Sequence, residues 1–306
     1  VVVAIIDTGA DTLHPDLADN IWTNSGETAG NGLDDDHNGY IDDIHGWNFS
    51  GGNFDSIGNN DPSDGDGHGT HCAGIVAATT NNNKGMAGIA ENCQIMPLKI
   101  IPWPLTSRIA AALIYAADNG ADVANMSFGL NFRTHLMEEA LQYARQKGVI
   151  LCAAAGNDFT EQLNYPAGYE SVIAVGATND SDMIAPFSTY GDHLDISAPG
   201  HSILSLRASG TDMYGIDYPQ EPNVHIVDSF YYIASGTSMA CPHVVGVAAY
   251  LRAVSPGLTP DKAQEIIEQT ADDIIDPYGV GWNLPGFDKY SGFGRINLFR
   301  ALEATP

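Results

Sequence analysis

Short apolar runs recur along the chain and are separated by polar or amphipathic stretches. Runs rich in Val, Ile, Leu and Ala cover residues 1–6, 95–101, 123–126, 149–155, 172–176 and 194–198. A run that is mostly apolar, without the alternation of a half-buried strand, is typical of a strand whose two faces are both buried, as in a parallel sheet. These six segments are therefore predicted to be strands of one buried sheet.

Apolar residues at helical spacing lie between and after these runs. They predict helices over residues 69–78, 107–119, 134–147, 260–270 and 295–304, and a further helix that follows Ser238. Strands that alternate with helices indicate an α/β fold of three layers (αβα), with a mostly parallel central sheet. Residues 20–66 are rich in Gly, Asn and Asp and predict a loop. A loop of that length is expected to be functional or stabilised by an ion.

Composition narrows the possible partners. The 306 residues hold 12 Lys+Arg and 38 Asp+Glu, a formal charge of −26, which disfavours nucleic acid and anionic lipid and favours cations. No apolar run approaches the roughly 20 residues that span a bilayer, and the chain opens on a strand without a signal peptide.

We find no repeat or linker, so residues 1–306 are expected to form one domain. Cys72, Cys93, Cys152 and Cys241 lie in apolar contexts and are expected to be buried thiols.

One serine stands at the start of a predicted helix, in Ser235-Gly236-Thr237-Ser238. Thr237 or Ser238 is predicted to be the N-cap. A hydroxyl there lies beside free backbone N–H groups that suit an oxyanion, and Gly236 lets a ligand approach the backbone. A capped helix in a core would show the same local pattern, and a serine becomes a nucleophile only beside a base.

His68 is the candidate base, because Gly67 and Gly69 leave room for a substrate. His68 and His71 stand three residues apart, so a zinc pair is an alternative, but the chain has no HExxH and no third ligand at motif spacing. His71 and His243 are expected to be core histidines.

Asp7 has two interpretations. Asp7-Thr8-Gly9 matches the active-site loop of aspartic proteases, which need a second such aspartate, and the chain holds no second copy. Alternatively, Asp7, Ser127 and Asn157 each follow a predicted strand. Ligands collect at the carboxyl ends of parallel strands, so these three residues are expected to share one crevice.

Asp7, His68 and Ser238 occur in the order Asp…His…Ser. That order, with residues 4–9, 66–74 and 236–243 around them, resembles the subtilisin-like serine proteases (subtilases). The resemblance implies that Ser238 attacks a peptide carbonyl, that His68 takes the Ser238 proton and that Asp7 orients the imidazole. It also implies that Asn157 and the Ser238 N–H hold the oxyanion.

The resemblance extends to substrate binding. It implies that Ser127, Phe128 and Gly129 form a strand edge to which an extended peptide adds. Ala153, Ala154 and Gly156 would form a wall of the pocket for the residue before the cleaved bond. Asn164 would lie near the pocket floor, where most relatives have a small residue, so side chains of moderate size are expected to be preferred.

The acidic loop carries a candidate calcium site. Asp34, Asp36 and Asn38 fit the pattern D-x-D-x-N-G, with the Tyr40 carbonyl as a further ligand. His45 replaces the glutamate expected at position twelve, so Asp42 or Asp43 would have to substitute. The family resemblance implies a second calcium site that joins Asp16 to residues 81–83, including Asn81. A solvated acidic turn is the alternative for the first.

Together these features predict a calcium-stabilised, secreted serine endopeptidase with broad specificity for unfolded polypeptides. The resemblance also implies a pro-segment that assists folding and inhibits the enzyme. The alternatives are a peptide ligase or macrocyclase on the same fold, a catalytically silent peptide binder, and a calcium-dependent structural module. The chain departs from the family pattern in three places. Only six residues precede Asp7, residues 100–105 form a shorter loop than is usual in the family, and residues 208–232 form a longer one, which is a candidate lid.

Overall fold

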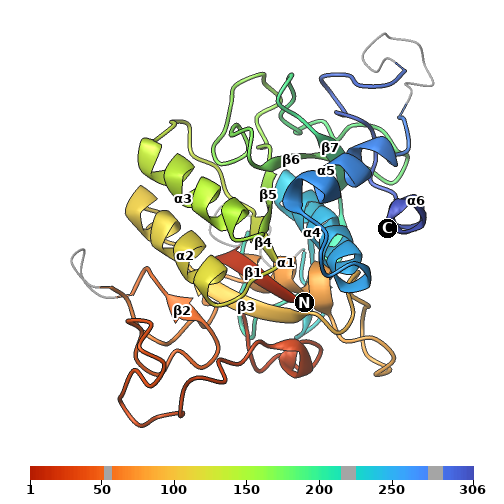
Figure 1. Cartoon of the computed structure of the whole chain (residues 1–306). Coiled ribbons are helices and arrows are strands. Elements are labelled where there is room, and N and C mark those ends of the chain that lie inside the picture. Colours follow the sequence, from red (N-terminus) through yellow and green to blue (C-terminus); the bar gives the residue numbers. More distant parts are fainter. Residues whose placement is uncertain (52–56, 215–224, 275–284) are drawn as a thin grey trace.

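A seven-stranded parallel sheet forms the centre of the molecule (Figure 1). The computed structural model describes residues 1–51, 57–214, 225–274 and 285–306. The strand order is β2-β3-β1-β4-β5-β6-β7, and every pairing in it is parallel. The strands are β1 Val2–Asp7, β2 Trp47–Asn48, β3 Gln94–Lys99, β4 Val123–Met126, β5 Ile150–Ala154, β6 Ile173–Thr178 and β7 Ile196–Pro199. The predicted parallel sheet is confirmed.

Helices cover both faces of the sheet (Figure 1). α1 His68–Ala77, α4 Thr237–Val254, α5 Pro260–Gln269 and α6 Leu298–Ala304 contribute to the core on one face. α2 Thr106–Asp118 and α3 His135–Gln146 pack with a second core on the other face. The three-layer α/β architecture is thus confirmed. α4 has 12 buried residues among its 18, because its apolar positions run all round it.

The predicted loop over residues 20–66 contains a short strand. β2 pairs in parallel with β3 through Trp47 opposite Leu98, and both Trp47 and Phe49 are buried. A two-residue strand gives too little periodicity to be recognised in sequence. Just before this segment, Ala18–Asn20 form a 3-10 helix, η1.

A second, two-stranded antiparallel sheet was not predicted. It consists of β8 Ile203–Leu206 and β9 Tyr231–Ala234, which bracket the long segment 208–232. β9 leads directly into α4, so this small sheet determines how the chain approaches Ser238. Residues 215–224 of the candidate lid lie outside the described residues.

All four cysteines are buried and unpaired, as predicted. Within the described part of the chain, no helix has both the length and the apolar character that crossing a membrane requires.

Candidate active site

The candidate catalytic residues gather at the carboxyl edge of the sheet. Asp7 ends β1, Ser127 follows β4 and Asn157 follows β5. His68 begins α1, and Ser238 lies in the first turn of α4. The chain adds β3 and β2 on one side of β1 and β4 on the other, so the strand order reverses between β1 and β4. A crevice at such a reversal is where α/β sheets bind ligands.

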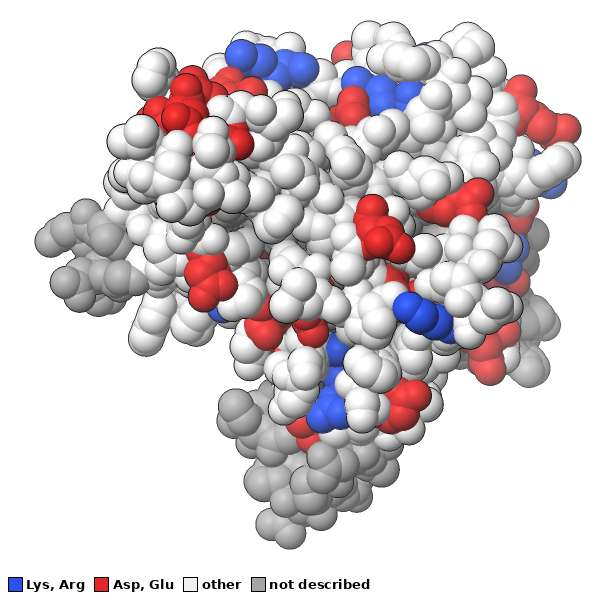
Figure 2. Space-filling model, turned by 90° about the horizontal axis from the view of Figure 1, so that it is seen from below, with Lys and Arg blue, Asp and Glu red and all other residues white. Residues whose placement is uncertain are grey.

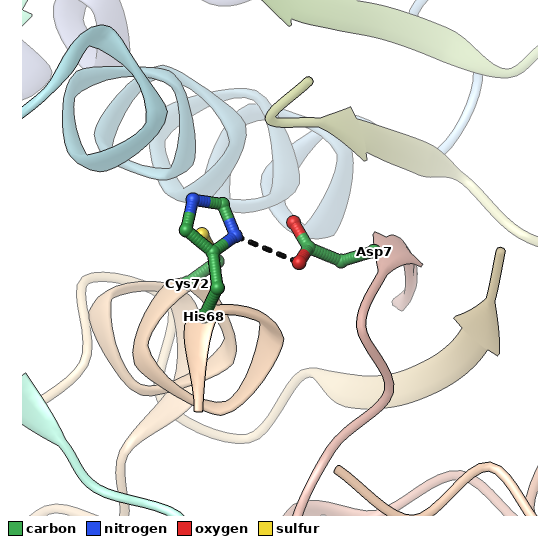
Figure 3. A group of neighbouring side chains, drawn as sticks. All are labelled: Asp7, His68 and Cys72. Atoms are coloured by element: carbon green, nitrogen blue, oxygen red, sulfur yellow. Dashed lines mark hydrogen bonds and ion pairs between the residues drawn. The ribbon is translucent and has the colours of Figure 1, made fainter. Parts of the chain in front are cut away.

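Asp7 and His68 form a direct pair. His68 Nδ1 lies 2.7 Å from Asp7 Oδ1 (Figure 3), and the Thr8 N–H donates to the same oxygen at 2.7 Å. Asp7 is completely buried, whereas the His68 side chain keeps 22% of its surface exposed. The second carboxylate oxygen, Oδ2, has no hydrogen-bond partner among the described residues. The carboxylate therefore has His68 as its cationic partner.

Negative charges favour the protonated form of His68. Burial alone would lower the pKa of His68, but the charge and hydrogen bond of Asp7, with the charges of Asp66 and Asp64, raise that pKa to about 9. The Asp7 carboxylate thus stabilises the imidazolium form of His68.

The start of α1 is fixed by its own loop. Gly67 is the N-cap with φ of 114°, a conformation that favours glycine. The Asp64 carboxylate accepts from the Gly67 N–H at 2.9 Å, and from the N–H and hydroxyl of Thr70. These bonds satisfy donors that a helix start leaves free. They hold His68 at the first position of the helix.

His71 and Cys72 do not extend the site. His71 is buried, its Nε2 lies 3.2 Å from the Ile203 carbonyl oxygen, and burial lowers its pKa to about 3. Cys72 Sγ lies within 4.8 Å of ligand atoms of Asp7 and His68 (Figure 3), but burial raises the thiol pKa well above its usual range. A thiol that stays protonated is a poor metal ligand. It donates instead to the Ser238 carbonyl at 3.4 Å.

The prediction of Thr237 or Ser238 as N-cap of α4 is wrong. Gly236 is the N-cap, and Thr237 is the first helical residue. The Thr237 hydroxyl is used in tertiary contacts: it donates to Asn157 Oδ1 at 3.0 Å and accepts from the Gly156 N–H at 3.1 Å. Ser238 thus occupies the second helical position, where its own N–H has no intrahelical partner.

The Ser238 hydroxyl forms a hydrogen bond with Ser127, the residue that follows β4. It donates to the Ser127 carbonyl at 3.2 Å, while the Ser127 hydroxyl donates to the Ser238 carbonyl at 2.9 Å. The second ring nitrogen of His68 faces α4 in Figure 3. Hydrogen bonds of catalytic groups commonly tighten only once substrate binds.

Asn157 is oriented by the serine helix. Its Oδ1 accepts from the Thr237 N–H at 2.8 Å and from the Thr237 hydroxyl. With its oxygen engaged, the side chain turns its NH2 group outward, and a Cβ placed on Gly236 would lie 3.4 Å from that nitrogen. Asn157 is exposed. The amide can therefore donate to an oxygen atom above the first turn of α4.

Asn164 lies between the predicted pocket wall, residues 153–156, and the predicted strand edge, residues 127–129. Its Nδ2 donates to the Ala155 carbonyl at 3.0 Å. A Cβ placed on Gly156 would come within 2.2 Å of that nitrogen, and a Cβ on Gly129 would lie 3.4 Å from the Asn164 Cβ. Ala153 and Ala154 are buried in β5, and Phe128 packs on the core. The Asn164 side chain thus fills space between Gly129 and Gly156.

The acidic loop brings together a set of ligands that differs from the predicted one. Carboxylate oxygens of Glu27, Asp36 and Asp43 lie within 4.8 Å of one another. The amides of Asn24 and Asn38 each donate to both Asp36 and Asp43. Burial raises the pKa of Asp43, and hydrogen bonds from Tyr115, Asn38 and Asn24 oppose that rise. Three converging carboxylates supply hard oxygen ligands of the kind that calcium prefers.

The side chains of Asp34 and Tyr40 make further contacts in this loop. Asp34 accepts backbone N–H bonds from Asn38 and Gly39, which closes the turn and leaves its carboxylate outside the group of three. The Tyr40 ring packs edge-on against Trp47 and Tyr115. Glu27 was not predicted because it lies seven residues before the recognised pattern. Only its placement in space reveals it.

Asp16 lies beside residues 81–83, as the family resemblance implied. It is buried, its Oδ1 accepts from Asn82 Nδ2 at 2.5 Å, and its Oδ2 accepts from the Tyr231 hydroxyl at 3.0 Å. Asn82, rather than the predicted Asn81, makes the contact. Asn81 has φ of 59°, and its amide faces Thr80.

Comparison with known proteins agrees with this geometry. A family model described as "Subtilase family" matches residues 1–294. A thermophilic serine proteinase of Bacillus sp. (strain AK1) is 38% identical over 303 residues, which are 98% of this chain and 61% of the relative. Thermitase of Thermoactinomyces vulgaris is 35% identical over 307 residues, which are 98% of this chain and 88% of the relative.

A solved structure shares the fold. The crystal structure of fervidolysin from Fervidobacterium pennivorans, described as a keratinolytic enzyme related to subtilisin, matches with a TM-score of 0.76 and 32% identity. The match covers 100% of this chain and 43% of that one, so this chain spans less than half of fervidolysin. Since a family model matches nearly every residue, and the fold and identities agree, the chain belongs to the subtilase family.

Proposed function

We propose that the chain is a serine endopeptidase in which Asp7, His68 and Ser238 form the catalytic triad. The observation that carries the proposal is the Asp7–His68 pair at 2.7 Å, set at the sheet edge near the first turn of α4, which holds Ser238. Asp7 holds the imidazole in one orientation and stabilises its charged form. A peptide binder would not require a buried carboxylate to orient a histidine.

The reaction follows from these positions. Ser238 Oγ attacks the peptide carbonyl carbon while its proton passes to the free nitrogen of His68. The Asn157 NH2 and the Ser238 N–H stabilise the oxyanion. The C–N bond then breaks, and His68 gives the proton to the leaving amine. Water repeats the sequence on the acyl-enzyme, which releases the acid and restores Ser238.

We propose that the substrates are extended, unfolded polypeptides. The backbone of Ser127 to Gly129 would pair with the peptide as an added strand, so that binding depends little on sequence. The Ser127 carbonyl, which the Ser238 hydroxyl occupies at rest, would accept a peptide N–H. Asn164 would restrict the pocket before the cleaved bond to side chains of moderate size.

We further propose that calcium stabilises the fold. Glu27, Asp36 and Asp43 would hold one ion, and Asp16 with residues 81–83 a second. Millimolar calcium outside cells suits a secreted enzyme, and a pro-segment would act as inhibitor and folding aid, as the family resemblance implies. Each of these is an expectation that follows from the proposed function.

Intact-mass labelling with a fluorophosphonate tests the triad. The native protein should gain one adduct in calcium-containing buffer, and Ser238→Ala should gain none. Ser255→Ala, at the other end of α4, is the matched control and should label like the wild type. Absence of an adduct on the folded native protein would refute the proposal. The masses of the products from a test peptide separate hydrolysis from ligation.

A further inference from the structure

The segment that follows β8 contacts the chain on both sides of the proposed active site. A Cβ on Gly67, next to His68, would come within 2.7 Å of the Thr211 hydroxyl. Three residues later, Tyr214 packs against the buried cluster of Ile75, Tyr232, Ala234 and Met239, and Met239 follows Ser238 in the chain. The segment is therefore in contact with the residues beside both His68 and Ser238.

The Tyr214 hydroxyl makes an unusual pair of bonds with a single residue. It donates to the Ser235 carbonyl at 2.9 Å and accepts from the Ser235 N–H at 3.1 Å. Ser235 is the residue between the end of β9 and Gly236, the N-cap of α4. One side-chain oxygen thus satisfies both the backbone N–H and the carbonyl of Ser235, just before the turn that leads to Ser238.

Tyr214 is itself held in place. Its N–H donates to the Tyr232 hydroxyl at 3.3 Å, and that hydroxyl donates to Asp212 at 2.7 Å. The rings of Tyr214 and Tyr232 lie 5.9 Å apart, and Tyr232 is completely buried. A buried ring that anchors Tyr214 gives its hydroxyl a fixed position.

The turn that follows Ser235 needs such support. The Gly236 N–H donates to the Gly200 carbonyl at 2.8 Å, the Gly236 carbonyl accepts from the first turn of α4, and Ser235 Oγ accepts from the Ser202 N–H at 2.8 Å. A rotation of the Ser235 peptide groups would move the Ser238 N–H relative to Asn157. Small displacements of this kind reduce catalysis because oxyanion donors work only at the right distance.

We propose that Tyr214 is a positioning residue that holds the turn before Ser238 through the backbone of Ser235. The inference rests on the proposed protease function. It gives the long segment 208–232 a role, because one of its described residues supports the turn before Ser238.

Tyr214→Phe is the test, because it removes the hydroxyl and keeps the ring. We expect kcat to fall by about tenfold, less than the 10²–10³ of a lost oxyanion donor. KM should stay within about twofold, since the peptide would pair with Ser127 to Gly129. The fluorophosphonate rate constant should fall with kcat, while the final labelling still reaches one adduct per chain. Tyr143→Phe, whose hydroxyl bonds to Asp118 on the far face of the sheet, should match the wild type.

Three results separate the possibilities. Unchanged kcat in Tyr214→Phe would overturn the inference. A lower number of labelled sites with unchanged kcat per labelled site would also overturn it, because that pattern marks a purely structural role. If the wild type itself neither labels nor cleaves peptide, the proposed function fails first, independently of Tyr214.

Discussion

At the scale of single residues, Asn164 determines the predicted size of the substrate pocket. Its amide lies between the backbone at Gly129 and Gly156, bonded to the Ala155 carbonyl. Asn164→Gly should open the pocket and raise kcat/KM for peptides with Phe or Tyr before the cleaved bond by about tenfold or more, the value of about two buried methylenes. A peptide panel measures this. If the wild type already cleaves fastest after Phe or Tyr, the pocket assignment is wrong.

His68 determines the pH dependence. A general base acts unprotonated, so kcat/KM should rise with pH through the pKa of His68, which lies well above the ordinary 6.5 and near 9. Asp66→Asn removes a negative charge that raises the pKa of His68. The amide oxygen of the new side chain can still accept the backbone N–H of His68, which lies 3.2 Å from Asp66 Oδ1. The acid limb of the profile should therefore move to lower pH.

Glu139→Gln is the control for this charge effect. Glu139 is exposed on α3, on the opposite face of the sheet from α1, and its loss should leave the limb in place. A limb that moves equally in both variants would show that net charge, rather than the neighbourhood of His68, sets the profile.

At the scale of elements, α4 is the helix on which the site depends. Gly246 lies on its buried face, where an added Cβ would come within 2.7 Å of the Ile89 Cβ. Overpacking costs about 1–3 kcal/mol, against up to about 1 kcal/mol gained from the helix propensity of Ala. Gly246→Ala should therefore lower the free energy of unfolding.

Thermal or denaturant unfolding measures this difference. Gly257→Ala is the matched control, because its Cβ would meet nothing within 4 Å, and its stability should change by less than about 0.5 kcal/mol. A Gly246→Ala variant as stable as this control would mean that α4 and the Ile89 segment can separate without cost.

The same elements show what the sequence determines. β4 was predicted at residues 123–126 and is observed as Val123–Met126, because a short, mostly apolar run in an α/β pattern has few alternatives. The N-cap of α4 was mispredicted because the Thr237 hydroxyl bonds to Asn157, 80 residues away in the sequence. Glu27 and the Tyr214–Ser235 contact likewise depend on tertiary contacts that no local pattern contains.

At the scale of the whole molecule, the net charge of −26 raises the question of what neutralises it. Acidic side chains lie in separate groups over the face in Figure 2, with a few basic ones among them. The group of Glu27, Asp36 and Asp43 differs because its oxygen atoms converge and Asp43 is fully buried. Dispersed charges are screened by salt, whereas converging carboxylates supply the oxygen ligands that our proposed calcium ion would take.

Calcium should therefore raise the unfolding temperature, and EDTA should lower it, since a ligand that binds only the folded state stabilises it. Glu27→Gln keeps an oxygen for the Asp35 N–H, now bonded at 2.7 Å, and removes one charge. In EDTA its unfolding temperature should equal or exceed that of the wild type, while its gain with calcium should be smaller. An unchanged wild-type melt in EDTA would remove both proposed sites.

The proposed site draws on residues spread over most of the chain, from Asp7 and His68 to Asn157 and Ser238. Synthesis begins at the N-terminus and adds about 5–20 residues per second, so the ribosome needs roughly 10 s or more after His68 to reach Ser238. Until then the carboxyl edge of the sheet lacks both its nucleophile and α4, whose side chains fill the core beneath it. In the proposed mechanism the nascent chain therefore cannot cleave a peptide until most of it has been synthesised, because its nucleophile is among the last parts of the site to be added.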